Sequence, residues 1–421
     1  MPREPASTAL ALAIVGEAFV VVVVGGMGSI GGAYIAALAI GVLKALCVWL
    51  GTVDLLGVAV SFPKLTQVIE FLFMAVVLAV KPQGLLGRRE SLNLLTLNQE
   101  FKPLPRPNNT FKICAVLAVA AILAWLVSQA SGSYAVTLAT EVAIAALFAM
   151  SLHFLLGTAG MPSFGHAALF GVGAYTVGVI HQQLGLGIAL TLVMAASVGA
   201  AVGVVTALLT AKMTGVYRAM LTLAIAQLLW SASYQWDGLT GGSNGLTDVW
   251  ADPPWNNNAW LLWLCMALLA LCTAAMLLGL RSRLGLQLRA LRDAPARAAS
   301  LGLHPLRLRM GAFAISGWVA ALAGALYALT KGTVAPDVLA VHQSVNGLIM
   351  VLLGGVNSLT GALTGAAAWT LIQDILIRQV PYWRAAMGSL ILLVVLYFPY
   401  GISGVLERFS ATKRTGHRSH V

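Results

Sequence analysis

The chain has 421 residues, of which 59% are hydrophobic and only 9% are charged. Soluble domains carry about a quarter charged residues, and a mean hydropathy of +0.88 leaves too little polar surface to cover a water-soluble globule. The net charge of +11 comes from basic residues between apolar runs. This pattern indicates orientation in a membrane rather than binding to nucleic acid. The composition predicts an all-α, polytopic transmembrane helix bundle.

Thirteen apolar segments follow one another along the chain, and we expect each to be a membrane segment. Three precede a polar stretch and ten follow it. They lie near residues 9–24, 31–50, 66–80, 113–129, 134–156, 164–182, 187–211, 216–236, 259–280, 310–330, 344–356, 361–377 and 385–399.

The charges of the connecting segments predict the orientation of the bundle. Residues 281–309 hold seven arginines and one acidic residue, and 81–112 hold six basic and two acidic residues. Residues 237–258 carry three aspartates and no lysine or arginine, whereas the tail after residue 404 is basic. Basic loops stay on the cytoplasmic side, so the acidic loop is expected outside. Acidic residues in or near the apolar segments (Glu17, Glu141 and Asp374) are interpreted as paired structural charges.

An internal repeat divides the chain into two parts. GGMGSIGGA at 25–33 matches GGVNSLTGA at 354–362, and PQGL at 82–85 matches PYGI at 399–402. Residues of about 12–87 are therefore a second version of about 341–404. The first copy is only the end of a unit, whereas the second closes a complete one. The proline-containing stretch 88–112 is then a linker between two modules.

The glycine-rich stretch GTAGMPSFGHAALFGVGAY at 157–175 is expected to break a helix inside the membrane. Such breaks are tolerated where they are packed in protein or line a cavity. His166 is an ionisable group in this stretch, which makes it either a functional residue or a structural partner of a neighbouring helix. The candidates for a translocation path or helix break are Gly160, Ser163, His166, Gly171, Tyr175 and Thr222.

A short helix is predicted in the arginine-rich segment. Asp293 can cap its N-terminus, Pro295 fits its first turn, Gly302 can end it, and Pro305 prevents continuation. Residues 294–301 between them are mostly small. A small-faced cytoplasmic helix flanked by arginines suits docking into a groove on a partner protein, and the alternative is an ordinary basic loop.

The remaining motifs give limited information. LTGGSNGL at 239–246, with Thr240, Gly241, Gly242 and Asn244, is either part of an outer mouth or a plain turn. Nucleotide-binding and catalytic motifs are lacking, and the four cysteines show no metal or disulfide pattern. The sequence thus predicts no enzyme and no cofactor. Energy for transport would come from an ion gradient or from a separate ATPase.

Four motifs in the same order resemble the M-type permease of branched-chain amino-acid ABC importers. They are the 157–175 stretch, GVYRAMLTLAIAQLLW at 215–230, LTGGSNGL, and the arginine-rich segment, followed by GGVNSLTGALTGA at 354–366. The resemblance covers about 112–404. It implies cytoplasmic ATP-binding subunits, a periplasmic substrate-binding protein and a second, H-type permease as partners. It also implies a coupling helix that carries Arg289, Arg292, Asp293, Ala298, Ala299 and Gly302.

The N-terminal part resembles the C-terminal end of the H-type permease, through AFVVVVVGGMGSIGGA at 18–33 and KPQGLLG at 81–87. The expected domains are an H-type fragment (1–87), a cytoplasmic linker (88–112), a complete M-type permease (113–404) and a basic cytoplasmic tail (405–421). The resemblance implies import of leucine, isoleucine and valine across the bacterial inner membrane. Urea or another amino acid is the alternative solute, and an ion-coupled secondary transporter is a more distant alternative.

Overall fold

The computed structural model describes residues 8–26, 28–55, 58–61, 66–81, 83–87, 110–129, 133–211, 213–251, 253, 255–356, 358–397 and 401. Most of the expected linker and the whole basic tail lie outside these residues. In chain order the helices are α1 (Thr8–Gly25), α2 (Ile30–Leu50), α3 (Thr66–Val80), α4 (Thr110–Gln129), α5 (Ser133–His153), η3 (Phe154–Thr158), α6 (His166–Leu184), α7 (Ile188–Leu209), α8 (Gly215–Gln235), α9 (Asp237–Thr240), η4 (Gly242–Asn244), α10 (Asn258–Arg281), α11 (Arg283–Asp293), α12 (Pro295–Ser300), α13 (Pro305–Lys331), η5 (Pro336–Leu339), α14 (Val341–Gly354), α15 (Leu359–Gln379) and α16 (Trp383–Tyr397).

Each of the thirteen apolar segments is a helix, which confirms the polytopic helical fold. Among the described residues, five helices are long and apolar enough to cross a membrane, and α14 with α15 makes a sixth if they are one span. These two helices meet at 117°. The break follows Gly355, whose φ of 108° is open to glycine but strained for other residues. The count of thirteen crossings stays a prediction.

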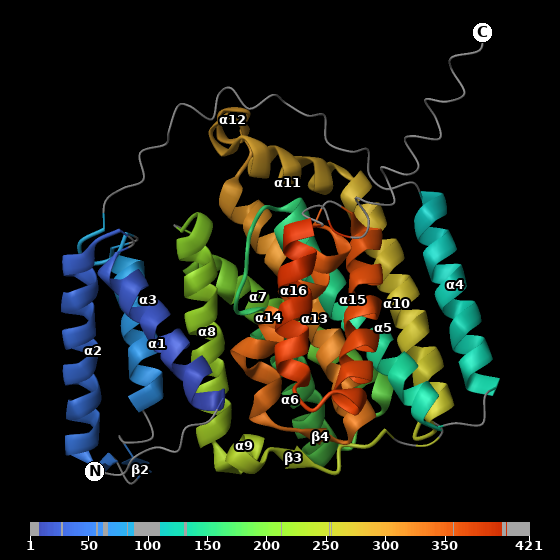
Figure 1. Ribbon diagram of the computed structural model, residues 1–421, viewed down its shortest axis with the longest axis horizontal. Helices are drawn as coiled ribbons and strands as arrows, with labels where there is room; N and C mark the ends of the chain where they lie inside the picture. Colours follow the sequence, from blue (N-terminus) through green and yellow to red (C-terminus); the bar gives the residue numbers. More distant parts are fainter. Residues whose placement is uncertain are drawn as a thin grey trace.

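The centre of the module is α13, which packs along α5, α6 and α7 (Figure 1). Glycines let these helices approach closely: a Cβ on Gly324 would overlap the Phe170 carbonyl of α6, and one on Gly203 would overlap the Phe313 carbonyl of α13. Small residues at the contacts replace the hydrophobic driving force that lipid does not supply between membrane helices. Most of the buried apolar side chains form one continuous core around α13.

The N-terminal helices α1–α3 pack on one another and on α8. Helix α3 runs along α8, and Met74 and Leu78 of α3 share a buried cluster with Met220 and Ala224 of α8. In Figure 1, α2 lies at the left edge of the molecule and α8 stands between this unit and the rest of the module. Inside the unit, Lys44 of α2 forms ion pairs with Glu17 of α1 at 2.8 Å and with Glu70 of α3 at 2.6 Å.

The internal repeat is visible in the geometry of its two glycine turns. Ser29 caps α2 by accepting a hydrogen bond from the amide of residue 32, and Ser358 caps α15 in the same way, both at 3.1 Å. Gly26 and Gly355 both have positive φ. A Cβ on Gly84 would collide with Gly26, and a Cβ on Gly401 would collide with Gly355. The two copies therefore have the same glycine turn, the same serine cap and the same glycine contact at that turn.

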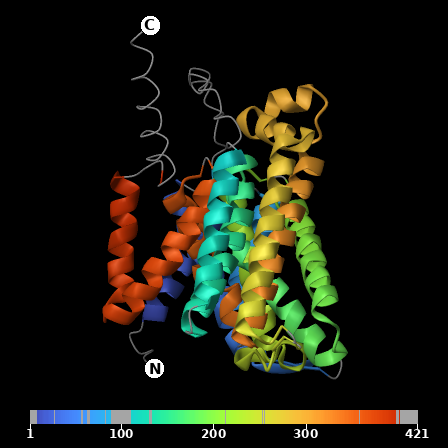
Figure 2. The same ribbon diagram turned by 90° about the vertical axis from the view of Figure 1, so that its right-hand side faces the viewer.

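The basic and acidic connections lie at opposite ends of the bundle. Helices α11 and α12 stand at the upper end, whereas α9 lies at the lower end with the short strands β3 (Leu246–Thr247) and β4 (Thr333–Val334) (Figures 1 and 2). These strands pair antiparallel, as do β1 (Thr52–Leu55) and β2 (Val58–Ser61). These two short strand pairs are minor additions to the predicted helical fold in the part of the chain that the structure describes.

Candidate coupling and translocation site

The chain breaks its helical path between η3 and α6, within the glycine-rich stretch. The first turn of a helix leaves amide groups without helical partners, and here neighbouring helices supply acceptors. The Phe164 amide donates to Thr222 Oγ1 of α8 at 3.1 Å, and the Ala167 amide donates to Ser344 Oγ of α14 at 2.8 Å. Gly165 allows this segment to approach α8 closely, because a Cβ at position 165 would overlap the Thr222 carbonyl. The break is thus internally satisfied, as lipid requires.

His166, the first residue of α6, is completely buried against α5. Its Nε2 lies 2.8 Å from Ser151 Oγ. The Ser151 hydroxyl donates its only proton to the Phe148 carbonyl, so Nε2 is the donor in the contact with the imidazole. Ser316 of α13 in turn donates to the Ser151 carbonyl at 2.7 Å. His166 therefore joins α6 to α5 and α13 in this conformation, and its assignment to a translocation path stays a prediction.

The other candidates from the glycine-rich stretch are spread along α6. Ser163 and Tyr175 are buried, and Gly171 packs against Leu339 of η5. Thr222 is brought to the break by α8, as described above. Gly160 lies further toward α11 and is exposed. The structure therefore brings Thr222 to the segment that carries Ser163 and His166, whereas Gly171 and Tyr175 lie further along α6.

The arginine-rich segment consists of two helices at one end of the bundle. Leu288 and Leu291 of α11 are buried, whereas α12 projects outward with Ala298 buried and Ala299 exposed. Gly302 ends this hairpin with a φ of 82°, and the Leu303 amide donates to the Ala298 carbonyl at 3.1 Å. Helix α11 is an element that sequence reasoning did not identify, although its buried leucines recur at a helical spacing.

The expected capping role of Asp293 is wrong. Ala294 is the N-cap residue of α12, which has no side-chain cap. Asp293 instead accepts a hydrogen bond from Arg292 Nε at 2.9 Å, as an ion pair. Burial, and next the charge of Arg292, lower the pKa of Arg289, while Asp293 raises it. Asp293 thus offsets the repulsion between two arginines on the same helix, and it is therefore not available to cap the next one.

Arg292 also connects α11 to the helix break. Its guanidinium donates to the carbonyl oxygen of Gly157 in η3, at a helix end where a cation is favoured. Gly160 has a φ of 64°, and a Cβ on it would overlap the Arg292 side chain. The segment that breaks the membrane helix is therefore tied to the exposed basic hairpin by one side chain. The sequence placed Arg292 and Gly160 in two separate motifs and did not pair them.

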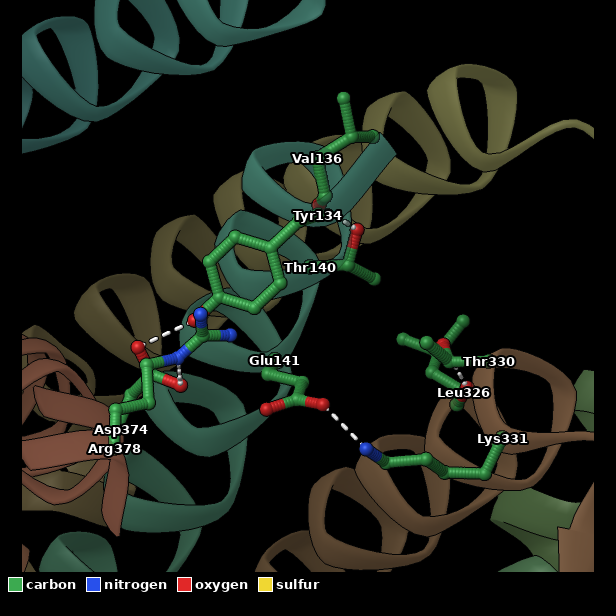
Figure 3. Close-up of polar contacts among 9 residues, drawn as sticks. All are labelled: Tyr134, Val136, Thr140, Glu141, Leu326, Thr330, Lys331, Asp374 and Arg378. Carbon is green, nitrogen blue, oxygen red and sulfur yellow. Dashed lines mark hydrogen bonds and ion pairs between the residues drawn. The ribbon is translucent and has the colours of Figure 1, made fainter. Parts of the chain in front are cut away.

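The acidic residues of the membrane segments have partners in the structure. Glu141 of α5 forms an ion pair with Lys331 at the end of α13 (Figure 3). Asp374 accepts a hydrogen bond from the Tyr134 hydroxyl and pairs with Arg378 one turn along α15, at 3.3 Å. With the pair of Glu17 and Lys44, the interpretation of these three acids as paired charges is confirmed.

The glycine-rich loop at the other end is a tight, ordered turn. The Thr240 hydroxyl lies 2.6 Å from the Ser233 carbonyl and 2.7 Å from the Trp236 carbonyl, and its single proton is shared between these two acceptors. Gly241 and Gly242 have positive φ, and a Cβ on Gly242 would overlap the Asp237 carboxylate. Asn244 is exposed at the turn. The geometry explains these residues as a turn that leads into β3, which pairs with β4, and a role in an outer mouth stays a prediction.

The described residues contain no group of three or more histidine, cysteine or acidic side chains that could hold a metal ion. A bundle of long apolar helices, with an internally capped break and a basic helical hairpin tied to that break, is the architecture of a polytopic membrane protein. Comparison with known proteins gives the family. The chain belongs to the family described as "Branched-chain amino acid transport system / permease component", which matches residues 134–398.

The relatives of the chain are transport permeases. It is 26% identical over 317 residues to the high-affinity branched-chain amino acid permease LivM of Salmonella typhimurium, covering 69% of this chain and 74% of the relative. It is 26% identical over 308 residues to the probable LivM of Methanocaldococcus jannaschii, covering 61% and 89%. The autoinducer 2 permease LsrC of Klebsiella pneumoniae is 32% identical over 202 residues, covering 46% and 55%. No solved structure matches the chain. The protein is a LivM-like permease.

Proposed function

We propose that this permease moves branched-chain amino acids into the cell across the bacterial inner membrane, driven by separate ATP-binding subunits. The observation that carries the ATP-driven part of the proposal is the contact from Arg292 to the Gly157 carbonyl. It links an exposed cytoplasmic hairpin to the broken helix inside the bundle. An ATPase that moves the hairpin therefore has a direct mechanical connection to the membrane interior.

Helix α12 is the part that docks on the ATPase. Its exposed side carries Ala296, Ala299 and Ser300, and Arg297 lies beside them. Small side chains let a short helix sit deep in a groove, and an arginine adds a charge contact at the rim. The buried Ala298 holds α12 against the protein, so that α12 and α11 move together.

Movement of α11 is passed to the start of α6 through Arg292 and the 157–165 segment. The amides at the start of α6 are held by hydroxyls of α8 and α14. Because each of these bonds joins a different helix, a shift of the segment changes the packing of several helices together. Such a rearrangement alternates access between the two sides of the membrane. Packed interfaces with two arrangements convert small local shifts into larger ones.

The opposite end of the bundle receives the solute from a soluble binding protein. Asp237 and Asp248 are exposed there beside the ordered turn, and they give that end a negative charge that suits a basic surface on the binding protein. A second permease of the H-type completes the path. None of the residues at the break distinguishes leucine from other small solutes by its chemistry.

The substrate assignment rests on the names of the LivM relatives. The LsrC relative is an import permease for autoinducer 2, which makes autoinducer 2 the second candidate substrate. Urea and other amino acids are tested with it as competitors. An ion-coupled mechanism is separated from an ATP-driven one by its response to an uncoupler.

The test is uptake of labelled leucine by cells that carry the complete importer, with and without this gene. We expect uptake to be lost on deletion, to be lost when the ATP-binding subunit is inactivated, and to survive an uncoupler at constant ATP. Unlabelled isoleucine and valine should compete, whereas urea, acidic amino acids and autoinducer 2 should not. Uptake that survives ATPase inactivation but not the uncoupler would contradict the ATP-driven mechanism. Competition by autoinducer 2 alone would move the substrate to the second candidate.

A further inference from the structure

His153, the last residue of α5, is a buried side chain that none of the contacts described above uses. It is 4% exposed, and neither ring nitrogen has a hydrogen-bond partner in the part of the chain that the structure describes. Burial of an imidazole without a partner costs free energy that an apolar side chain of similar size would not cost. Filling of space therefore does not account for a histidine at this position.

The His153 ring lies where three parts of the bundle meet. A Cβ on Gly157 would be 2.9 Å from His153 Nε2 and 2.5 Å from the carbonyl oxygen of Val356. That carbonyl is close enough to interact with the imidazole, but the two groups are not in hydrogen-bonding geometry. Gly157 also accepts from Arg292 of α11. One residue of the broken segment thus contacts α11, the end of α5 and the turn between α14 and α15.

The helix turn that follows His153 is able to change its width. In η3 the Ala159 amide donates to the Phe154 carbonyl, five residues earlier, at 3.2 Å. Such π turns hold more residues than α turns and are frequent at functional sites. Return of η3 to α geometry would move the segment after it by about 1.5 Å, the rise of one residue. A displacement of this size decides whether a nearby ring nitrogen and carbonyl oxygen form a hydrogen bond.

The turn that carries Val356 belongs to two helices that are packed tightly together. A Cβ on Gly354 would be 1.8 Å from the Gly361 carbonyl, and one on Gly361 would be 2.6 Å from the Gly354 carbonyl. Helix α14 also holds the other end of the broken segment, because Ser344 accepts from the Ala167 amide. A force applied at Val356 therefore acts on α14 and α15 together and reaches the start of α6.

We propose that His153 is a positioning residue for coupling, whose Nε2–H donates to the Val356 carbonyl when the ATP-binding subunits move α11. The bond carries the movement of the broken segment into the α14–α15 pair. The inference deepens the proposed function and rests on it for the ATP-driven movement. Because the bond is not made in the conformation described here, its formation favours the other conformation. Two packed arrangements that differ in such a contact form a two-state switch.

The first test measures leucine taken up and ATP hydrolysed in the same sample, with the purified complete importer in liposomes. His153→Gln retains an N–H donor close to the position of Nε2, whereas His153→Met has a similar length and no donor. We expect His153→Met to lower the ratio of leucine to ATP by about tenfold, and His153→Gln to keep a ratio close to that of the wild type. An unchanged ratio in His153→Met, or an equal loss in both variants at equal melting temperature, would overturn the proposal.

A double variant tests whether His153 and Arg292 act in series. If they do, His153→Met combined with Arg292→Ala should have a ratio of leucine to ATP no lower than that of the more affected single variant. Independent residues would instead give losses that multiply, because their free-energy effects add. Multiplied losses would show that His153 does not transmit the movement that begins at Arg292, and would overturn the proposal.

A distance measurement separates this inference from the proposed function. Spin labels are placed on cysteines at Leu352 of α14 and Leu271 of α10, which are 47% and 60% exposed. The background is Cys114→Ser, because the three other cysteines are buried. Addition of ATP to the complete importer should change the distance between the labels in the wild type and in His153→Gln, but not in His153→Met.

The outcomes for the two proposals differ. No ATP-dependent change in the wild type, or a change that persists in His153→Met, would overturn the role of His153 even where leucine uptake is driven by ATP. Leucine uptake that is independent of ATP, together with a distance change that requires a donor at position 153, would overturn only the proposed function.

Discussion

Arg292 of the basic hairpin donates a hydrogen bond to the main-chain carbonyl of Gly157, 135 residues earlier in the chain. This contact joins the basic end of the molecule to the break before α6. Gly157 is confined on its other side, where a Cβ would be 2.5 Å from the Val356 carbonyl. The broken segment is therefore held between α11 and the turn that links α14 to α15.

Replacement of Gly160 by alanine should weaken coupling. The φ of 64° costs an ordinary residue about 1–2 kcal/mol, and the new Cβ would displace the Arg292 side chain. We expect leucine uptake to fall by about tenfold or more with little change in membrane level. The control is Gly185→Ala, which has a similar φ but open space around its Cβ. Equal loss of uptake in both variants would mean that backbone strain alone is responsible.

If α12 docks on the ATPase as proposed, Ala299→Glu should uncouple transport by placing a charged side chain in that contact. The side chain at position 299 is exposed in the permease itself, so the substitution should not affect its fold. Ala290→Glu, also exposed but on α11, is the matched control. Co-purification of the ATP-binding subunit and leucine uptake should both fall for the first variant only. Full uptake by Ala299→Glu would show that the coupling helix is misplaced.

Thr222→Val removes the hydroxyl that accepts from the Phe164 amide. A buried amide left without a partner costs about 1–3 kcal/mol; the Phe164 amide is only partly buried, so the melting temperature of the purified protein in detergent should drop by a few degrees at most. Thr222→Ser keeps the hydroxyl and should have a melting temperature close to that of the wild type. The same loss is expected for Ser344→Ala, whereas Ser389→Ala, on the exposed side of α16, should have no effect. An unchanged melting temperature for Thr222→Val would remove the capping role.

The ion pair of Glu141 and Lys331 can be tested by exchange of charges. Glu141→Lys places two cations side by side near α5 and α13, and the level of folded protein should fall. The double variant Glu141→Lys with Lys331→Glu restores the pair in Figure 3 and should recover much of that level. Double-variant cycles of this kind measure the coupling between two contacting residues directly. Additive losses in the double variant would show that the pair contributes no stability.

Much of the fold follows from the sequence because apolar length alone determines membrane helices. The segments expected at 66–80 and 134–156 correspond closely to α3 and to α5 with η3. The repeat was also readable, since a glycine turn with positive φ requires the same residues in both copies. The bend between α14 and α15 could not be predicted. Two apolar runs separated by a glycine turn give the same sequence pattern whether they cross the membrane as two spans or as one bent span.

The site was only partly predictable. Gly302 could be read as a helix end because a left-handed residue after a helix favours glycine. Asp293 was misread because its competing partner, Arg292, is its neighbour in sequence and gave no separate signal. The contacts from Arg292 to Gly157 and from Ser344 to the start of α6 join segments more than a hundred residues apart. Local patterns carry no information on such pairs.

The most direct test of the account is transport by the purified importer in liposomes, with the wild-type chain and with Arg292→Ala. Leucine taken up and ATP hydrolysed are measured in the same sample, and Arg283→Ala, an exposed residue at the start of α11, is the control. Loss of a hydrogen bond from a charged donor costs about 1.5–3 kcal/mol. We therefore expect Arg292→Ala to keep most of its ATP hydrolysis while leucine uptake falls by about tenfold or more. An unchanged ratio of leucine to ATP would contradict the role of Arg292 as the link between the two sites.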